Sequence, residues 1–183
     1  MLNERKSAQM AAYFAKKEGG QIAVLKLIKL LYLADRESLD QYSYPMSGDC
    51  PVSMPHGPVL SGTYSLISMG SNSPDGWESW ISDRENHEVR LHRDFERKDL
   101  DELSDAEVTI MQEVWQRFGL MDRWQIRDYT HDHCSEWQDP QGSSRPISFA
   151  DIFRALGRSP EEAQELAENL RSEQATDQLL MSM

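Results

Sequence analysis

The chain has little cysteine and no long apolar run. Cys50 and Cys134 are the only two cysteines among its 183 residues, so the sequence offers no disulfide framework. Its longest apolar run, at residues 30–34, is far shorter than the roughly 20 residues that a membrane span requires. The first residues show no apolar segment typical of a signal peptide. We therefore expect a cytoplasmic protein with reduced thiols and no membrane contact.

Cations are also scarce, since 19 Lys and Arg residues face 31 Asp and Glu residues and the formal net charge is −12. Nucleic-acid affinity comes largely from Lys and Arg at phosphates, so nucleic-acid binding by this chain alone is not favoured. Residues 1–40 carry seven Lys or Arg against five Asp or Glu, a net charge of +2. The acidic residues concentrate in residues 75–113 and in the C-terminal segment. This asymmetry favours a basic protein partner, unless the acidity serves solubility alone.

Apolar periodicity and capping residues predict a single, mostly α-helical domain of the α+β class with a small antiparallel β-sheet or hairpin. Prolines and glycines interrupt residues 44–59, which favours an irregular hairpin, with Pro58 as the first residue of the next helix. We expect the domain to span residues 1–158, and an acidic helix over residues 159–183 to pack on it or extend from it. Helices are predicted at residues 3–18, 21–41, 58–70, 104–118, 123–133 and 149–156, and short strands at 77–81 and 87–92.

The helix predicted at residues 21–41 is apolar on nearly every side, which is typical of a central core helix. Lys26 and Lys29 lie three residues apart and share one face of it. Together with Arg36 and the N-terminal lysines they could form a basic strip, so a DNA-binding transcriptional autoregulator remains an alternative function. Five tryptophans add large apolar anchors, most of them expected in the core and one or two at an interface.

Histidines and cysteines suggest a second alternative, a metal or Cys/His hydrolase. His131, His133 and Cys134 lie within four residues, and Cys50 and His56 are the spare candidates. These spacings match no zinc template, and no nucleophile elbow or phosphate-binding loop occurs. We therefore expect no catalytic residue, no metal ligand and no cofactor.

Three motifs occur in a fixed order along the chain. K-L-x-K-L-L-Y stands at residues 26–32, G-P-V at residues 57–59 and T-H-x5-W at residues 130–137. This set resembles the Panacea domain, also called the SocA-type antitoxin domain, which is related to the phage-associated GepA proteins. The resemblance covers residues 23–156. The chain departs from the family pattern at His56, Tyr129 and Glu136, where Tyr, Leu and Pro are common.

The resemblance implies a non-enzymatic antitoxin of a bacterial or prophage type II toxin–antitoxin system that binds and neutralises a cognate protein toxin. At least one type of family member hands its toxin to a protease, which adds a Clp-type machine as a candidate partner. With the charge asymmetry, the resemblance leads us to expect that residues 75–113 and the C-terminal helix engage a basic toxin.

The resemblance also implies structural or partner-binding roles for the motif residues. Gly57 would let the chain turn tightly, and Thr130 and His131 would bond backbone groups near that turn. The full set comprises Lys29, Tyr32, Asp35, His56, Gly57, Pro58, Val59, Thr130, His131 and Trp137.

Overall fold

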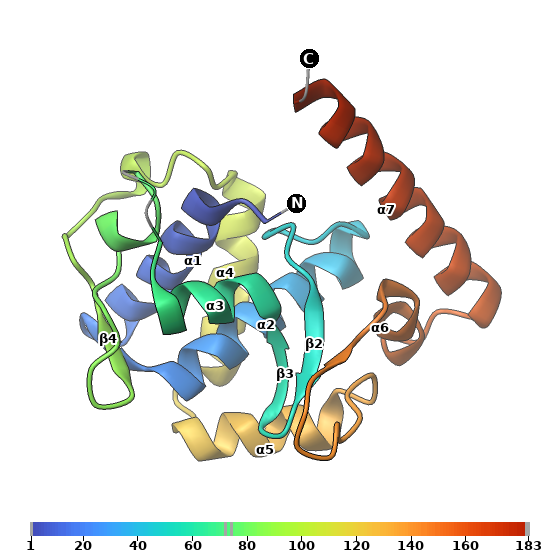
Figure 1. Cartoon of the computed structure of the whole chain (residues 1–183), viewed down its shortest axis with the longest axis horizontal. Helices are drawn as coiled ribbons and strands as arrows, with labels where there is room; N and C mark the ends of the chain where they lie inside the picture. Colours follow the sequence, from blue (N-terminus) through green and yellow to red (C-terminus); the bar gives the residue numbers. More distant parts are fainter. Residues whose placement is uncertain (1, 72, 74, 182–183) are drawn as a thin grey trace.

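The computed structural model describes residues 2–71, 73 and 75–181 and confirms the α+β class. In this part of the chain, helices surround one central helix; one small antiparallel sheet, with β4, lies at the left of the view, and the other, with β2 and β3, lies between the helices and α6 (Figure 1). The helices are α1 (Glu4–Lys17), α2 (Val24–Tyr42), α3 (Ser61–Met69), α4 (Asp105–Phe118), α5 (Arg123–His133), α6 (Phe149–Ala155) and α7 (Pro160–Met181). The strands are β1 (Gln21–Ala23), β2 (Pro51–Met54), β3 (Gly57–Leu60), β4 (Glu88–Arg90) and β5 (Arg145–Pro146).

The central position of α2 is confirmed. Thirteen of its 19 residues are buried, and α1, α4, α5 and β3 pack around it. Its start differs from the prediction, because residues 21–23 form β1 and the helix begins at Val24. β1 pairs with β4, which places Ile22 opposite Val89, and both side chains are buried.

The prediction of a strand at residues 77–81 is wrong. Trp77–Ser79 is a short 3-10 helix, and only Ile81 forms an isolated bridge, to Leu91. Trp77, Trp80 and Ile81 are all buried, and their spacing of three and four residues is helical rather than alternating. The strand predicted at residues 87–92 does form, as β4, but it pairs with β1.

The predicted hairpin is the pair β2–β3, whose turn consists of Pro55 and His56. Pro58 does not start a helix, as predicted, but lies in β3 opposite Ser53. β3 is an edge strand in the order β3-β2-β5, a position that tolerates the missing N–H of proline. α3 begins later, where the Asp49 carboxylate accepts hydrogen bonds from the Gly62 and Thr63 N–H groups.

The C-terminal part has a small core of its own. Ala163, Ala167 and Leu170 of α7 are buried in one cluster with Leu39 and Phe153; one narrow face of α7 packs on α6, and α6 in turn contacts α2. The other faces of α7 are polar, and the helix runs along one side of the molecule and away from it (Figure 1). Within the described residues, none of the helices is long and apolar enough to cross a membrane.

Candidate partner-binding site around the β2–β3 turn

Gly57 is the point at which three distant segments of the chain meet. Its φ is +95°, a conformation that favours glycine. A Cβ atom here would lie 2.9 Å from Lys29 Nζ on α2, 2.9 Å from Thr130 Oγ1 and 3.0 Å from His131 Cδ2 on α5. Only glycine therefore lets the turn approach α2 and α5 this closely.

Lys29 is fully buried beneath this turn. Its Nζ atom donates a hydrogen bond to the Pro58 carbonyl at 2.8 Å. Burial lowers the pKa of Lys29 to about 7, an effect that the nearby Cys134 opposes and Arg127 strengthens. No carboxylate forms an ion pair with Lys29 among the residues that the structure describes.

The segment after α5 clamps the turn from the other side. The Trp137 indole donates from Nε1 to the Met54 carbonyl at 2.9 Å, and its ring stacks on His131 at a centroid distance of 4.2 Å. Burial lowers the pKa of His131, and the positive charge of Lys29 lowers it further. The Thr130 hydroxyl donates to the backbone carbonyl of Arg127 on the same helix, and a hydrogen bond between His131 and the backbone of His56 in the turn opposes the lowering of the His131 pKa.

Tyr32 ties α2 to the same segment through Glu136. The Tyr32 hydroxyl donates to Glu136 Oε1 at 2.6 Å, and Arg36 Nε donates to the same oxygen at 2.7 Å. Burial, with the Glu136 charge, raises the pKa of Tyr32 well above its ordinary value. The contacts of Glu136 with Tyr32 and Arg36 were not predicted from the sequence. The unusual Glu at a position where the family commonly has Pro could have drawn attention to this residue.

Two aspartates organise the connections at the end of the β2–β3 hairpin that lies away from the turn. Asp35 is buried and accepts hydrogen bonds from the Ser47 backbone N–H, at 3.0 Å, and from the Ser47 hydroxyl. Burial raises the pKa of Asp35 to about 7, against the effect of these hydrogen bonds. Asp49, which was not among the residues predicted from the sequence, accepts from the first N–H groups of α3. Both residues have structural contacts and lie outside the turn.

Lys26, Lys29 and Arg36 do not form the basic strip that the DNA-binding alternative would need. Lys26 is buried and pairs with Glu18 at 2.6 Å while donating to the Gly119 carbonyl. Lys29 lies beneath the turn, and Arg36 is paired with Glu136. All three cations are therefore engaged inside the molecule and cannot together track phosphates.

The histidines and cysteines do not assemble into one site. Cys134 is buried, and burial raises the pKa of its thiol to about 12, so it carries almost no thiolate near neutral pH. Cys50 is exposed. In the described part of the chain, no group of three or more His, Cys, Asp or Glu residues could hold a metal ion.

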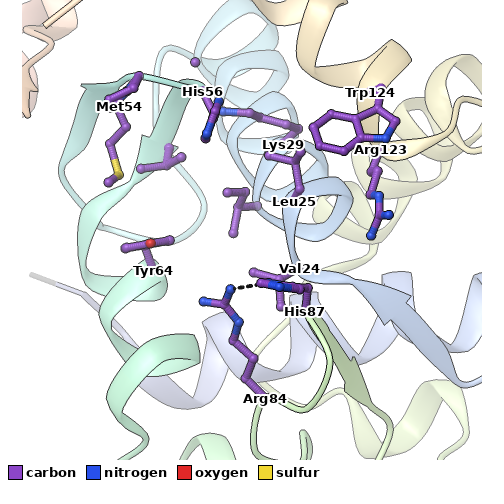
Figure 2. A pocket seen from close by; sticks show the side chains of 14 residues that line it. Val24, Leu25, Lys29, Met54, His56, Tyr64, Arg84, His87, Arg123 and Trp124 are labelled. Atoms are coloured by element: carbon purple, nitrogen blue, oxygen red, sulfur yellow. Dashed lines mark hydrogen bonds between the residues drawn. The ribbon is translucent and has the colours of Figure 1, made fainter. Parts of the chain in front are cut away.

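A pocket of about 450 Å³ opens beside the turn (Figure 2). Figure 2 shows Lys29 and His56 on one side of the open space and Arg84 and His87 on the opposite side. Most of the lining is apolar, and the polar side chains are mainly cationic. The lining residues are Val24, Leu25, Ile28, Lys29, Met54, Pro55, His56, Gly57, Val59, Tyr64, Arg84, His87, Arg123 and Trp124.

A comparison with protein families matches residues 27–138 to a family described as "Antitoxin SocA-like, Panacea domain". The matched stretch is more than half of the chain. The protein belongs to this family. The match confirms the predicted resemblance, and the chain carries an antitoxin-like SocA domain. Comparisons with curated proteins and with solved structures gave no significant match.

The stretch that matches the Panacea family contains the β2–β3 turn, Lys29 of α2 beneath it and the segment after α5 that holds it. It begins within α2 and ends directly after Trp137, so Lys29, Gly57 and His131 all lie inside it. All residues that line the pocket, except Val24 and Leu25, also lie inside it. α1, α6 and α7 lie outside the matched stretch. The pocket is thus largely a feature of the Panacea domain itself.

Proposed function

We propose that this protein is the antitoxin of a bacterial or prophage type II toxin–antitoxin pair and that it neutralises a cognate toxin in the cytoplasm by binding it. The family match over residues 27–138 is the observation that carries the proposal, because a family of antitoxins implies a toxin partner. The buried Cys134 thiol, with its raised pKa, gives no support to an enzymatic alternative.

The acidic outer face of α7 is the surface best placed to engage a basic toxin. Glu161, Glu165, Glu168 and Glu173 are exposed on it, and none of them forms an ion pair within the described residues. Unpaired surface charge of one sign steers an oppositely charged partner and raises the association rate. The proposal therefore places one part of the toxin contact on this helix.

The acidic segment at residues 75–113 contributes less than its composition suggests. Asp94 pairs with Lys16, Asp101 with Arg5 and Glu107 with Lys6, each at 2.6 Å. The cations of residues 1–40 and the acidic residues of the segment 75–113 thus partly neutralise one another in the fold. The exposed Asp75, Asp83 and Glu85 remain available for a partner.

Co-expression with neighbouring genes tests the proposal. Each neighbouring open reading frame is induced alone and together with this protein, and growth is followed while the tagged antitoxin is purified. We expect one frame to stop growth alone, to be tolerated with the antitoxin and to co-purify with it. The proposal fails when no neighbouring frame is toxic, or when rescue occurs without a complex.

Two further measurements refine this test. Glu161→Lys with Glu165→Lys should weaken toxin capture, whereas Asp132→Lys with Asp139→Lys, a matched exposed pair outside α7, should leave it unchanged. The toxin level in the rescued cells distinguishes two modes of action. Occlusion leaves the toxin level constant, and delivery to a Clp-type protease lowers it only in cells that contain the protease.

A further inference from the structure

The pocket beside the turn is cationic in an otherwise acidic molecule. Lys29, Arg84 and Arg123 line it together with His56 and His87, and none of its described lining residues is an Asp or Glu. The whole chain, by contrast, carries a formal net charge of −12. A local reversal of charge over an apolar floor points to a ligand that is both anionic and apolar.

The three basic residues of the pocket form no ion pair within the described part of the chain. Eleven of the 19 Lys and Arg residues form ion pairs in the described part of the chain, but Lys29, Arg84 and Arg123 do not. The guanidinium nitrogen Nη2 of Arg84 lies 2.8 Å from His87 Nδ1, and the Arg123 guanidinium lies over the Trp124 ring. The nearby Asp122 carboxylate instead accepts backbone hydrogen bonds at the start of α5. Arg84 and Arg123 are exposed and are therefore open to an external carboxylate.

Lys29 adds a buried basic side chain to the exposed arginines that line the pocket. Its ammonium has three donors, and within the described residues only the Pro58 carbonyl accepts from it. Burial without a carboxylate partner lowers the pKa of Lys29 to about 7, so an anion in the nearby pocket would favour its charged form.

The distribution of charge favours an extended ligand over a compact one. Lys29 with His56 and Arg84 with His87 lie on opposite sides of the space, and Leu25 lies between them (Figure 2). An apolar side chain flanked by carboxylates on a peptide can meet both sides, whereas a small organic acid meets only one. The rim also carries Trp124, 48% exposed, with Tyr64 and arginines, the residue types that dominate protein-binding hot spots.

We propose that this pocket is a docking site for an acidic–apolar segment of the partner toxin, whose apolar side chain enters the pocket while its flanking carboxylates meet Arg84 and Arg123. The inference rests on the proposed antitoxin function. None of the described residues of α7 lines the pocket, so the toxin would make two contacts of opposite charge, one with the acidic helix and one with the cationic pocket.

Three defined peptides test the pocket without knowledge of the toxin. The probes are acetyl-Ser-Glu-Phe-Glu-Ser-amide, the same peptide with both Glu replaced by Lys, and the same peptide with Phe replaced by Ala. Binding to the full chain is measured by titration calorimetry and by the NMR shifts of the tryptophan indole groups. We expect the Glu-Phe-Glu peptide to bind at least about tenfold more tightly than either of the others, with the Trp124 signal moving.

Charge-reversal variants locate the binding. Arg84→Glu with Arg123→Glu should lower the affinity for the Glu-Phe-Glu peptide by about tenfold or more. Arg145→Glu with Arg171→Glu, an exposed pair outside the pocket, should not weaken it. The proposal is overturned by equal affinity for acidic and basic peptides, by no binding at millimolar peptide, or by equal loss in the two variants. Phenylacetate that binds as tightly as the peptide would assign the site to a small organic acid instead.

The toxin identified by co-expression separates this inference from the function on which it rests. If Arg84→Glu with Arg123→Glu neutralises and captures the toxin as well as the native protein does, the docking site is wrong while the antitoxin function stands. If no neighbouring frame is toxic yet the acidic peptide binds the pocket, the antitoxin function fails and the peptide belongs to another partner. Loss of toxin capture in Arg84→Glu with Arg123→Glu, but not in Arg145→Glu with Arg171→Glu, supports both the docking site and the antitoxin function.

Discussion

At the residue scale, Gly57 and Lys29 hold the turn against α2 and α5. Gly57 supplies the positive φ and the missing side chain, and Lys29 supplies a hydrogen bond to the Pro58 carbonyl. Both were singled out from the sequence as motif residues. Their contacts were not predictable, because the partners lie about 30 and 70 residues away along the chain.

Gly57→Ala should destabilise the protein by about 3–4 kcal/mol, since it combines backbone strain with a clash against Lys29 and Thr130. Gly142→Ala is the matched control, because Gly142 has a similar φ of +91° and a methyl group there would meet no other atom within 4 Å. That variant should lose only about 1–2 kcal/mol. Urea unfolding of both variants measures the difference, and equal losses would show that the close approach at Gly57 is unimportant.

Lys29→Met should remove a pH dependence of stability. Burial lowers the pKa of Lys29 from 10.5 to about 7, so between these values the unfolded chain binds more protons than the folded chain. The native protein should therefore gain stability relative to Lys29→Met as the pH rises from about 7 to 9. Urea unfolding at several pH values measures this difference, with Lys98→Met as the exposed-lysine control. A constant difference across this range would contradict the assignment.

At the element scale, local signals predicted the helices well. Ser104, Asp122 and Ser148 each cap a helix and form a capping box with the third residue beyond, and α4, α5 and α6 begin where these signals place them. The failures lie where neighbouring elements decide. Pro58 is in an edge strand because β2 pairs with it, and residues 21–23 are extended because β4 pairs with them.

The contact between the β2–β3 turn and the segment after α5 depends on Trp137. Trp137→Phe keeps an aromatic ring against His131 but leaves the Met54 carbonyl without its donor, so we expect a loss of about 1–2 kcal/mol. Trp124→Phe, at a half-exposed tryptophan on α5, should change stability by less than about 0.5 kcal/mol. Thermal and urea unfolding compare the two variants. A similar small effect in both would mean that the Trp137 hydrogen bond adds little.

At the scale of the whole molecule, opposite charges that lie far apart in the sequence pair at the surface of the fold. Arg5, Lys6 and Lys16 of α1 pair with the acidic middle segment. The acidic face of α7 and the cationic pocket are left for partners. A basic toxin with an exposed acidic–apolar segment would fit both.

α7 should be separable from the rest of the fold by one substitution. Ala167→Glu places a carboxylate against the apolar face that packs on α6, which should release the helix at a loss of about 2–4 kcal/mol. Ala175→Glu, at an exposed position of the same helix, is the control. Hydrogen exchange should increase in α7 and α6 of Ala167→Glu while α2 to α5 stay protected. Exchange that rises throughout the chain would show that α7 and the Panacea domain unfold together.

The sequence by itself determined the helical majority, the central apolar helix, the hairpin and the family, because these depend on local periodicity, caps, turn residues and the order of motifs. Only the tertiary structure decided which charges remain available. Lys26 and Lys29 share a helix face with the spacing of a basic strip, yet both are buried, because Glu18, Gly119 and the Gly57 turn cover that face. The cationic pocket likewise combines residues of α2, α5, the β2–β3 turn and the loop before β4, which no local pattern brings together.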